Sequence, residues 1–267
     1  MNLSVDGHPA YAYTGAREFD PADDPLVFVH GGGLDHCVWL LQSRYFAHHG
    51  HGVMAVDLPG HGKSGGEALT SIADMADWVI RLLDAAGVES ATLVGHSMGA
   101  LVVHEAAARH PERVRRIVTI GISVPMPVTD ALLGAAMDNK HAAFDMVNVW
   151  GHGSRAHVGG NQAPGMWMMG LGVRLLERSR PGVLYAGLHA CNEYRDGLAS
   201  SARITCPVHV ILGRDDRMTP VKAAQPLLET LADARVTILE NCGHMIMAEK
   251  PGEVLDLLIA ALKDSEV

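Results

Sequence analysis

A serine between glycines is the strongest chemical signal in this chain of 267 residues, in the segment Gly95-His96-Ser97-Met98-Gly99. The segment follows an apolar run at 91–94 and precedes a helix-like stretch at 98–110. A sharp turn between a strand and a helix exposes the serine hydroxyl at the positive end of a helix dipole, which favours negative charge developing nearby. We therefore predict that Ser97 is a nucleophile. A glycine-rich turn without chemistry is the alternative, and the strand and helix on either side disfavour it.

A candidate acid and a candidate base follow later in the chain, each directly after an apolar run. Asp215 and Asp216 come after one run, and His244 comes after the next. The carboxyl ends of parallel strands share one edge of a sheet, so these side chains can meet Ser97 there. The order serine, aspartate, histidine predicts a triad in which His244 accepts the serine proton and Asp216 fixes the imidazole. Adjacent residues leave a strand in different directions, so only one of the two aspartates can reach the imidazole. Asp216 is preferred because it lies three residues after Gly213, which is the position of the acid in this motif.

A glycine loop supplies a third chemical feature. His30 is followed by Gly31, Gly32 and Gly33 at the end of another apolar run. Backbone N–H groups in such a loop can hold an oxyanion, and loss of one such donor in a well-studied protease costs about 2.7–4 kcal/mol of transition-state stabilisation. We expect the N–H groups of Gly32 and Met98 to form the oxyanion hole, with Gly33 as the weaker alternative to Gly32.

Three further side chains are candidates for contact with a substrate. Met218 and Met245 flank the predicted acid and base, and Trp167 lies in a methionine-rich stretch. Methionine is a flexible gap-filler, so packing in the core is the plain alternative. Cys242 lies two residues before the predicted base and is a rival nucleophile, but it lacks a strand-to-helix turn. We interpret Cys242 as structural.

Other patterns in the chain do not predict a cofactor. The segment 60–65 fits G-x-G-x-x-G, but no helix opens at its last glycine, so nucleotide binding is not expected. The 16 histidines include clusters at 48–51 and at 152–157, and neither has the ligand spacing of a metal site. We therefore expect no metal and no cofactor.

The elements that must position these residues alternate along the chain. Buried strands are predicted from apolar runs at 26–30, 53–57, 91–95, 116–120, 207–212 and 235–240. Helices are predicted near 37–48, 70–86, 98–110, 220–232 and 251–263. This alternation predicts an α/β fold with a mostly parallel sheet and helices on both faces. The dipeptide Asp6-Gly7 predicts an antiparallel hairpin before it.

The alternation breaks between residues 123 and 203. Helix-like pieces occur there at 129–150, 164–178 and 182–200, without a strand. We interpret 123–203 as a helical lid insertion into a core formed by 1–122 and 204–267. Glycine-rich joints at 151–153 and 159–160 favour movement, and lids of this kind often gate access to a site.

Five segments, HGGGLDHCVW, DLPGHGKS, GHSMG, GRDDRMTP and NCGHM, resemble successive signature segments of the α/β-hydrolase superfamily. They are specific for the fold and the triad and only weakly specific for the substrate. The resemblance implies Ser97 as nucleophile, Asp216 as acid and His244 as base, with the N–H groups of Gly32 and Met98 as oxyanion donors. Serine at the turn differs from the aspartate nucleophile of the dehalogenase and epoxide hydrolase branches. The insertion resembles the family's lid.

Composition limits the partners and the location of the protein. A net charge of −9 disfavours nucleic acid and anionic membranes because an acidic surface repels phosphates. No apolar run reaches the roughly 20 residues of a membrane span, and the N-terminus lacks the features of a secretory signal. The four cysteines show no paired spacing, which predicts reduced thiols and a cytoplasmic protein. No feature indicates an oligomeric state.

Together these features predict a carboxylesterase-like serine hydrolase. It would cleave small-molecule esters with small to medium acyl groups through an acyl-serine intermediate. Two alternatives stay open. A C–C bond hydrolase of ring-cleavage diketones shares the segment GRDDRMTP, and a ligand receptor could keep the fold with a slow triad. A complete set of nucleophile, acid and base favours turnover.

Overall fold

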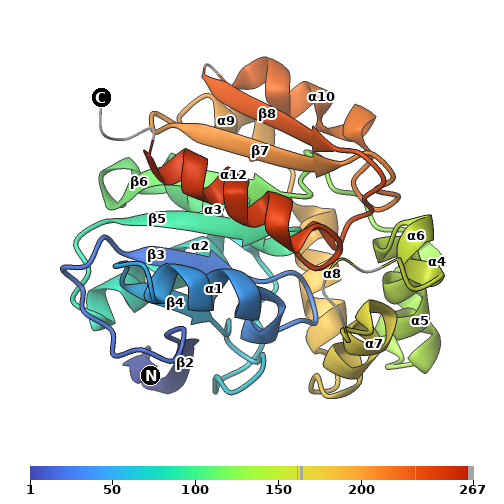
Figure 1. Ribbon diagram of the computed structural model, residues 1–267. Helices are drawn as coiled ribbons and strands as arrows, with labels where there is room; N and C mark the ends of the chain where they lie inside the picture. Colours follow the sequence, from blue (N-terminus) through green and yellow to red (C-terminus); the bar gives the residue numbers. More distant parts are fainter. Residues whose placement is uncertain (161, 163–164, 232, 264–267) are drawn as a thin grey trace.

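The computed structural model describes residues 1–160, 162, 165–231 and 233–263. One sheet forms its centre, with the strand order β1-β2-β4-β3-β5-β6-β7-β8. The strands are β1 (Asn2–Val5), β2 (His8–Tyr13), β3 (Leu26–Val29), β4 (Val53–Val56), β5 (Ala91–His96), β6 (Val114–Ile120), β7 (Val208–Gly213) and β8 (Ala234–Leu239). The strands β3 to β8 run parallel to one another, whereas β1 and β2 form an antiparallel hairpin at one edge. The predicted sheet and hairpin are confirmed (Figure 1).

Local sequence signals account for several of these boundaries. All six predicted parallel strands are present, with ends within two residues of the predicted ones. Asp6 and Gly7 have positive φ values of 52° and 78°, the backbone of a two-residue hairpin turn. The helix α2 (Ile72–Ala85) begins where the Ser71 hydroxyl accepts a hydrogen bond from the Asp74 N–H, as an N-cap serine does.

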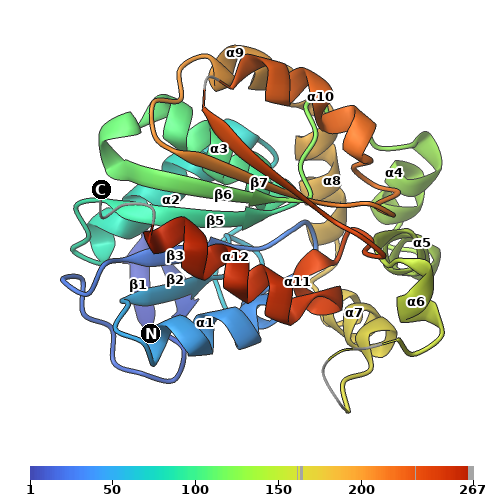
Figure 2. The same cartoon turned by 45° about the horizontal axis from the view of Figure 1, so that its top comes forward.

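Helices cover both faces of the sheet. The other helices of the core are η1 (His36–Trp39), α1 (Leu40–Ala47), α3 (Met98–Arg109), η2 (Pro111–Arg113), α10 (Val221–Thr230), α11 (Ile246–Glu249) and α12 (Pro251–Lys263). Buried residues of α2, α3 and α10 join a hydrophobic cluster on one face, and those of η1, α1, α11 and α12 join a second cluster on the other face. Figure 2 shows α1 and α12 together in front of the sheet. Within the described residues, no helix is both long and apolar enough to cross a membrane.

Between β6 and β7 the regular elements of the described residues are all helices. They are α4 (Asp130–Met137), α5 (His141–Gly151), α6 (Ser154–His157), α7 (Met168–Glu177), α8 (Val183–Glu193) and α9 (Gly197–Ser201). Figure 1 shows α4 to α7 grouped beyond the ends of the parallel strands. The predictions of single helical pieces over 129–150 and 182–200 are wrong, because each range holds two helices, α4 and α5 in the first and α8 and α9 in the second. Between α4 and α5, Asn139 has a φ of 51°, a left-handed conformation that ends a helix.

A buried ion pair anchors the loop that follows β3. Asp57, directly after β4, accepts hydrogen bonds from the His36 N–H at 2.8 Å and from the His36 Nδ1 at 2.9 Å. It also accepts the Lys63 N–H at 2.9 Å. Burial lowers the pKa of His36, but the hydrogen bond and charge of Asp57 outweigh it and raise that pKa to about 9. The carboxylate therefore holds the end of the glycine loop against the neighbouring strand.

Candidate active site

Ser97 lies on a strained turn between β5 and α3. Its φ is 55° and its ψ is −118°, and such a backbone costs a non-glycine residue on the order of 1–3 kcal/mol. The two glycines of the motif make the turn possible. A Cβ on Gly95 would lie 2.1 Å from the Gly99 carbonyl oxygen, and a Cβ on Gly99 would lie 2.3 Å from the Val29 carbonyl oxygen. The spacing G-x-S-x-G therefore follows from close contact between the turn, the helix and the adjacent strand.

Asp216 and His244 form a buried pair after β7 and β8. Their Oδ2 and Nδ1 atoms are 2.7 Å apart, and the residues are 4% and 3% exposed. The Asp216 Oδ1 accepts the N–H groups of Met218 and Thr219, each at 2.8 Å, and the Thr219 hydroxyl donates to Oδ2 at 2.7 Å. These bonds orient the carboxylate, which in turn orients the imidazole.

The charge of Asp216 determines which histidine nitrogen is available. Burial alone would raise the pKa of Asp216, but the nearby His244 and the hydrogen bonds from His244 and Thr219 lower it to about 2. With Nδ1 donating to this carboxylate, the Nε2 of neutral His244 is a proton acceptor. That Nε2 is buried without a hydrogen-bond partner in the described part of the chain. His244 and Ser97 line the same cavity, and a general base must lie close to the proton that it accepts.

Two residues that hold His244 were missed by the sequence analysis. The His96 Nε2 lies 3.0 Å from the His244 carbonyl oxygen, and the two rings are 4.8 Å apart. Burial lowers the pKa of His96 to about 3, so its ring is neutral and its Nε2 donates. A Cβ on Gly121 would lie 3.0 Å from the His244 Nδ1. His96 was visible as the residue before Ser97, whereas Gly121 carried no signal of its role.

The oxyanion candidates lie together in the wall of this cavity. Met98 is the first residue of α3, where backbone N–H groups have no acceptor within the helix. Both Met98 and Gly32 line the cavity, whereas Gly33 is not among its lining residues. A third residue, Gly187 of α8, packs against both, because its Cβ would lie 2.9 Å from the Met98 Sδ and 3.0 Å from the Gly32 Cα. Gly187 was not predicted from the sequence.

The cavity has a volume of about 130 Å³ and a largely apolar wall. More than half of its described lining residues belong to the segment between β6 and β7, including Leu132, Val147, Trp150, Leu176, Leu184 and Leu188. Met218 and Met245 line it as well, where the sequence analysis expected them. Trp167 does not belong to this group, because it is 74% exposed and lies outside the lining.

The segment between β6 and β7 is joined to the loop of the candidate base. The N–H groups of His244 and Met245 both donate to the Gly151 carbonyl oxygen, at 2.9 and 2.8 Å. The Glu249 carboxylate accepts the N–H of Gly153 at 3.0 Å and that of the residue before His244 at 3.1 Å. The glycine-rich stretch at 151–153 is therefore the point at which this segment is attached to the loop of the candidate base.

The remaining candidates lie apart from the site. Asp215 is exposed beside the buried Asp216, which agrees with the preference for the second aspartate. Cys242 is fully buried and outside the cavity lining. Burial raises the pKa of its thiol above the usual range, and a protonated thiol is a poor nucleophile.

Comparison with known proteins places the chain in a family. Residues 26–257 match the model of the alpha/beta hydrolase family. The chain is 29% identical over 253 residues to the pimeloyl-[acyl-carrier protein] methyl ester esterase of Aromatoleum aromaticum, covering 87% of this chain and 96% of that protein. It is 29% identical over 256 residues to the 2-hydroxymuconate semialdehyde hydrolase of Pseudomonas sp. (strain CF600), covering 88% and 85%.

A solved structure shows the same fold. An esterase from Exiguobacterium antarcticum has a TM-score of 0.84 with 18% sequence identity, covering 98% of this chain and 99% of that one. The chain belongs to the alpha/beta hydrolase family, and it is a hydrolase. The predicted superfamily and fold class are confirmed.

Replacing Asp216 with asparagine should remove a pH-dependent part of the stability. A carboxyl group whose pKa falls from 3.8 in the unfolded chain to about 2 in the folded protein stabilises the fold by about 2 kcal/mol above pH 4. This contribution is lost as the pH falls through 4 toward 2. At pH 6 we expect the free energy of unfolding of Asp216→Asn to be about 2 kcal/mol lower than that of the wild type. Urea titrations from pH 6 to pH 2.5 should show this difference shrinking.

Asp215→Asn is the matched control for this measurement. Its side chain is exposed, so the free energy of unfolding should stay close to that of the wild type across the range. A difference between wild type and Asp216→Asn that stays constant from pH 6 to pH 2.5 would contradict the lowered pKa.

Proposed function

We propose that the protein hydrolyses carboxylic esters through an acyl-serine intermediate, with Ser97 as nucleophile, His244 as base and Asp216 as acid. One observation carries the proposal: His244 is oriented by an ionised Asp216, has a buried Nε2 with no hydrogen-bond partner among the described residues, and lines the same cavity as Ser97. A serine hydroxyl is a weak nucleophile unless an adjacent base accepts its proton. The strained turn exposes the Ser97 hydroxyl, and the imidazole paired with Asp216 supplies the base.

The reaction would proceed in two halves. The Nε2 of His244 takes the hydroxyl proton as the Ser97 Oγ attacks the ester carbonyl, and Asp216 stabilises the resulting imidazolium. The backbone N–H groups of Met98 and Gly32 hold the tetrahedral oxyanion. The imidazolium then protonates the leaving alcohol, which leaves an acyl group on Ser97. A water molecule, deprotonated by His244, attacks that acyl group and releases the carboxylic acid.

The segment 123–203 would act as a lid that shapes the substrate pocket. The support is that it contributes most of the apolar lining over Ser97. Its attachment to the base loop at Gly151 would keep that part still while α7 and α8 adjust around the acyl group. The small apolar cavity favours a short to medium acyl chain, because each buried methylene contributes about 0.8 kcal/mol until the cavity is filled.

Ser97→Ala should abolish ester hydrolysis without unfolding the protein. Loss of a triad serine costs on the order of 10⁶-fold in kcat in a well-studied protease. The change to alanine removes only the hydroxyl group. An organophosphonate should attach once per chain, and peptide mapping should place it on Ser97. The control is Cys242→Ala, which should keep both labelling and activity. Label on Cys242, or full activity in Ser97→Ala, would overturn the mechanism.

Gly187→Ala should lower kcat because its new methyl group would press on the Cα of Gly32, whose N–H is a candidate oxyanion donor, and on the Sδ of Met98. The expected loss is up to about 10²-fold, the lower range for removing one donor. Gly134→Ala is the matched control, since Gly134 also lies in a helix of the insertion but a Cβ added there would meet no atom within 4 Å. Equal kcat values for the two variants on a nitrophenyl ester would argue against Gly187 supporting the oxyanion hole.

A second candidate function is hydrolysis of a C–C bond in a diketone acid. Arg217 is the only lysine or arginine among the described residues that line the cavity, and an arginine suits a substrate carboxylate. One relative of 29% identity is a 2-hydroxymuconate semialdehyde hydrolase. We rank this function second because a cation at the cavity also suits an ester that carries an acidic group.

A substrate panel on one preparation distinguishes these functions. For an esterase, kcat/KM on nitrophenyl esters should rise over the first few acyl carbons and then fall as the cavity fills. A C–C hydrolase should instead show weak, flat ester activity beside rapid cleavage of a vinylogous diketone acid. A receptor should turn over a few molecules and then stall. Either of the last two results would replace the esterase proposal.

A further inference from the structure

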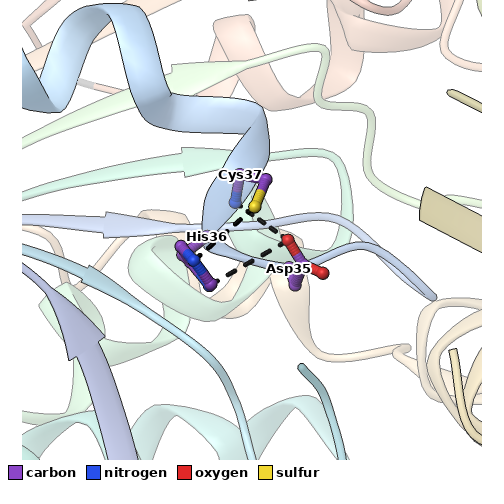
Figure 3. A group of neighbouring side chains, drawn as sticks. All are labelled: Asp35, His36 and Cys37. Carbon is purple, nitrogen blue, oxygen red and sulfur yellow. Dashed lines mark hydrogen bonds and ion pairs between the residues drawn. The ribbon is translucent and has the colours of Figure 1, made fainter. Parts of the chain in front are cut away.

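Three consecutive residues with metal-binding side chains converge outside the catalytic cavity. Asp35, His36 and Cys37 lie at the start of η1, and each offers a ligand atom within 4.8 Å of the other two. Figure 3 shows the three side chains gathered around a common space. This group was not predicted from the sequence, because three adjacent residues match no spacing rule for a metal site. Only the 3₁₀ turn of η1 brings their side chains to one side.

The buried Asp57 prepares His36 for metal binding. The Asp57 carboxylate accepts a hydrogen bond from the His36 Nδ1 at 2.9 Å. The His36 Nε2 is therefore directed away from Asp57 and toward Cys37. Histidines that bind metals usually donate their other ring nitrogen to a carboxylate in this way, which fixes the ring and raises its basicity. The His36 Nε2 and the Cys37 Sγ are 3.5 Å apart. Two ligands at about 2.0 and 2.3 Å from a tetrahedral zinc ion have a separation close to this.

We propose that Asp35, His36 and Cys37 form a binding site for a soft divalent cation, with Zn²⁺ as the best fit. Thiolate, imidazole and carboxylate are the ligands that zinc prefers, and three protein ligands leave a fourth position for solvent. A cavity of about 350 Å³ adjoins the group and gives access to that position. Binding displaces one proton from the Cys37 thiol and one from the His36 Nε2, and both leave to solvent.

Arg178 competes with a metal for this site. The Arg178 Nε donates to the Asp35 Oδ2 at 2.9 Å, and its Nη2 contacts both that oxygen and the Cys37 Sγ, the latter at 3.0 Å. The guanidinium thus supplies positive charge where a metal would supply it. Its side chain is 52% exposed, so it can turn away into solvent. Metal binding would therefore replace the Arg178 guanidinium with a metal ion from solution.

This exchange would change the attachment of α7. Arg178 caps the C-terminus of that helix, and its pairing with Asp35 ties α7 to the loop after β3. Two residues earlier, Leu176 lines the catalytic cavity and packs on Gly33, where a Cβ would lie 3.1 Å from the Leu176 Cδ2. A metal ion at Asp35 would break the Arg178–Asp35 pair, which holds α7 beside the contact between Leu176 and Gly33. Zinc binding is thereby linked to the mobility of one wall of the substrate cavity.

Titration of the untagged, reduced protein with Co²⁺ and then Zn²⁺ tests the site. We expect one thiolate-to-cobalt charge-transfer band, saturating at one ion per chain and abolished by equimolar Zn²⁺. Cys37→Ser should remove the band, and His36→Gln should weaken binding by more than the 10–100-fold typical of a lost outer partner. Arg178→Ala should bind at least about tenfold more tightly, because the competing cation is gone. Circular dichroism would confirm that each variant is folded.

Cys206→Ser is the matched control, because Cys206 is a partly exposed free cysteine outside the group. Its charge-transfer band and affinity should equal those of the wild type. In hydrogen exchange, Zn²⁺ should speed exchange of amides at 168–177 in the wild type and leave Cys37→Ser unchanged. A band that survives in Cys37→Ser, or no saturable band in either the wild type or Arg178→Ala, would overturn the site. Equal affinity of wild type and Arg178→Ala would overturn the exchange with arginine. None of these readouts depends on ester hydrolysis.

Discussion

Ser97 has a backbone φ of 55°, and the geometry of the site follows from this conformation. A positive φ at a serine is unfavourable and persists only where surrounding contacts impose it. The contacts here are between backbones, because Gly95 and Gly99 carry no Cβ and let α3 start directly against β3 and β5. That approach places the start of α3 beside the glycine loop after β3. The strained turn thus brings the candidate nucleophile and both candidate oxyanion donors to one point.

The base side of the site balances burial against pairing. Burial alone would disfavour the charge of Asp216, and the compensation comes from His244, Thr219 and two backbone N–H groups. A carboxylate that is fully satisfied in this way has one orientation, so the ring it holds has one as well. His96 adds a neutral donor to the His244 carbonyl oxygen, which fixes the loop as well as the ring. The His244 Nε2 has no hydrogen-bond partner among the described residues, although the residues around it are rigidly held.

The segment between β6 and β7 is connected to both halves of this site. Gly187 packs on Gly32 and on the Met98 side chain, and the Gly151 carbonyl oxygen accepts hydrogen bonds from the loop of the candidate base. A third connection, from Arg178 to Asp35, lies outside the cavity and is made by a half-exposed side chain. The first two contacts are buried and depend on backbone geometry, so they resist change. The third is ionic and accessible, which makes it the connection that an external cation can alter.

The parallel sheet, the turn at Ser97 and the chain order of the candidate nucleophile, acid and base can be read from the amino-acid sequence alone. These follow from local patterns, because apolar periodicity sets strands and because G-x-S-x-G reports steric limits within five residues. The place of Trp167 outside the cavity and the contacts of Gly121 and Gly187 depend on tertiary packing. A glycine that admits a distant ring or helix looks like any other glycine in the chain. Its requirement arises from atoms far away in sequence, and those atoms meet only after the sheet and the segment between β6 and β7 have packed.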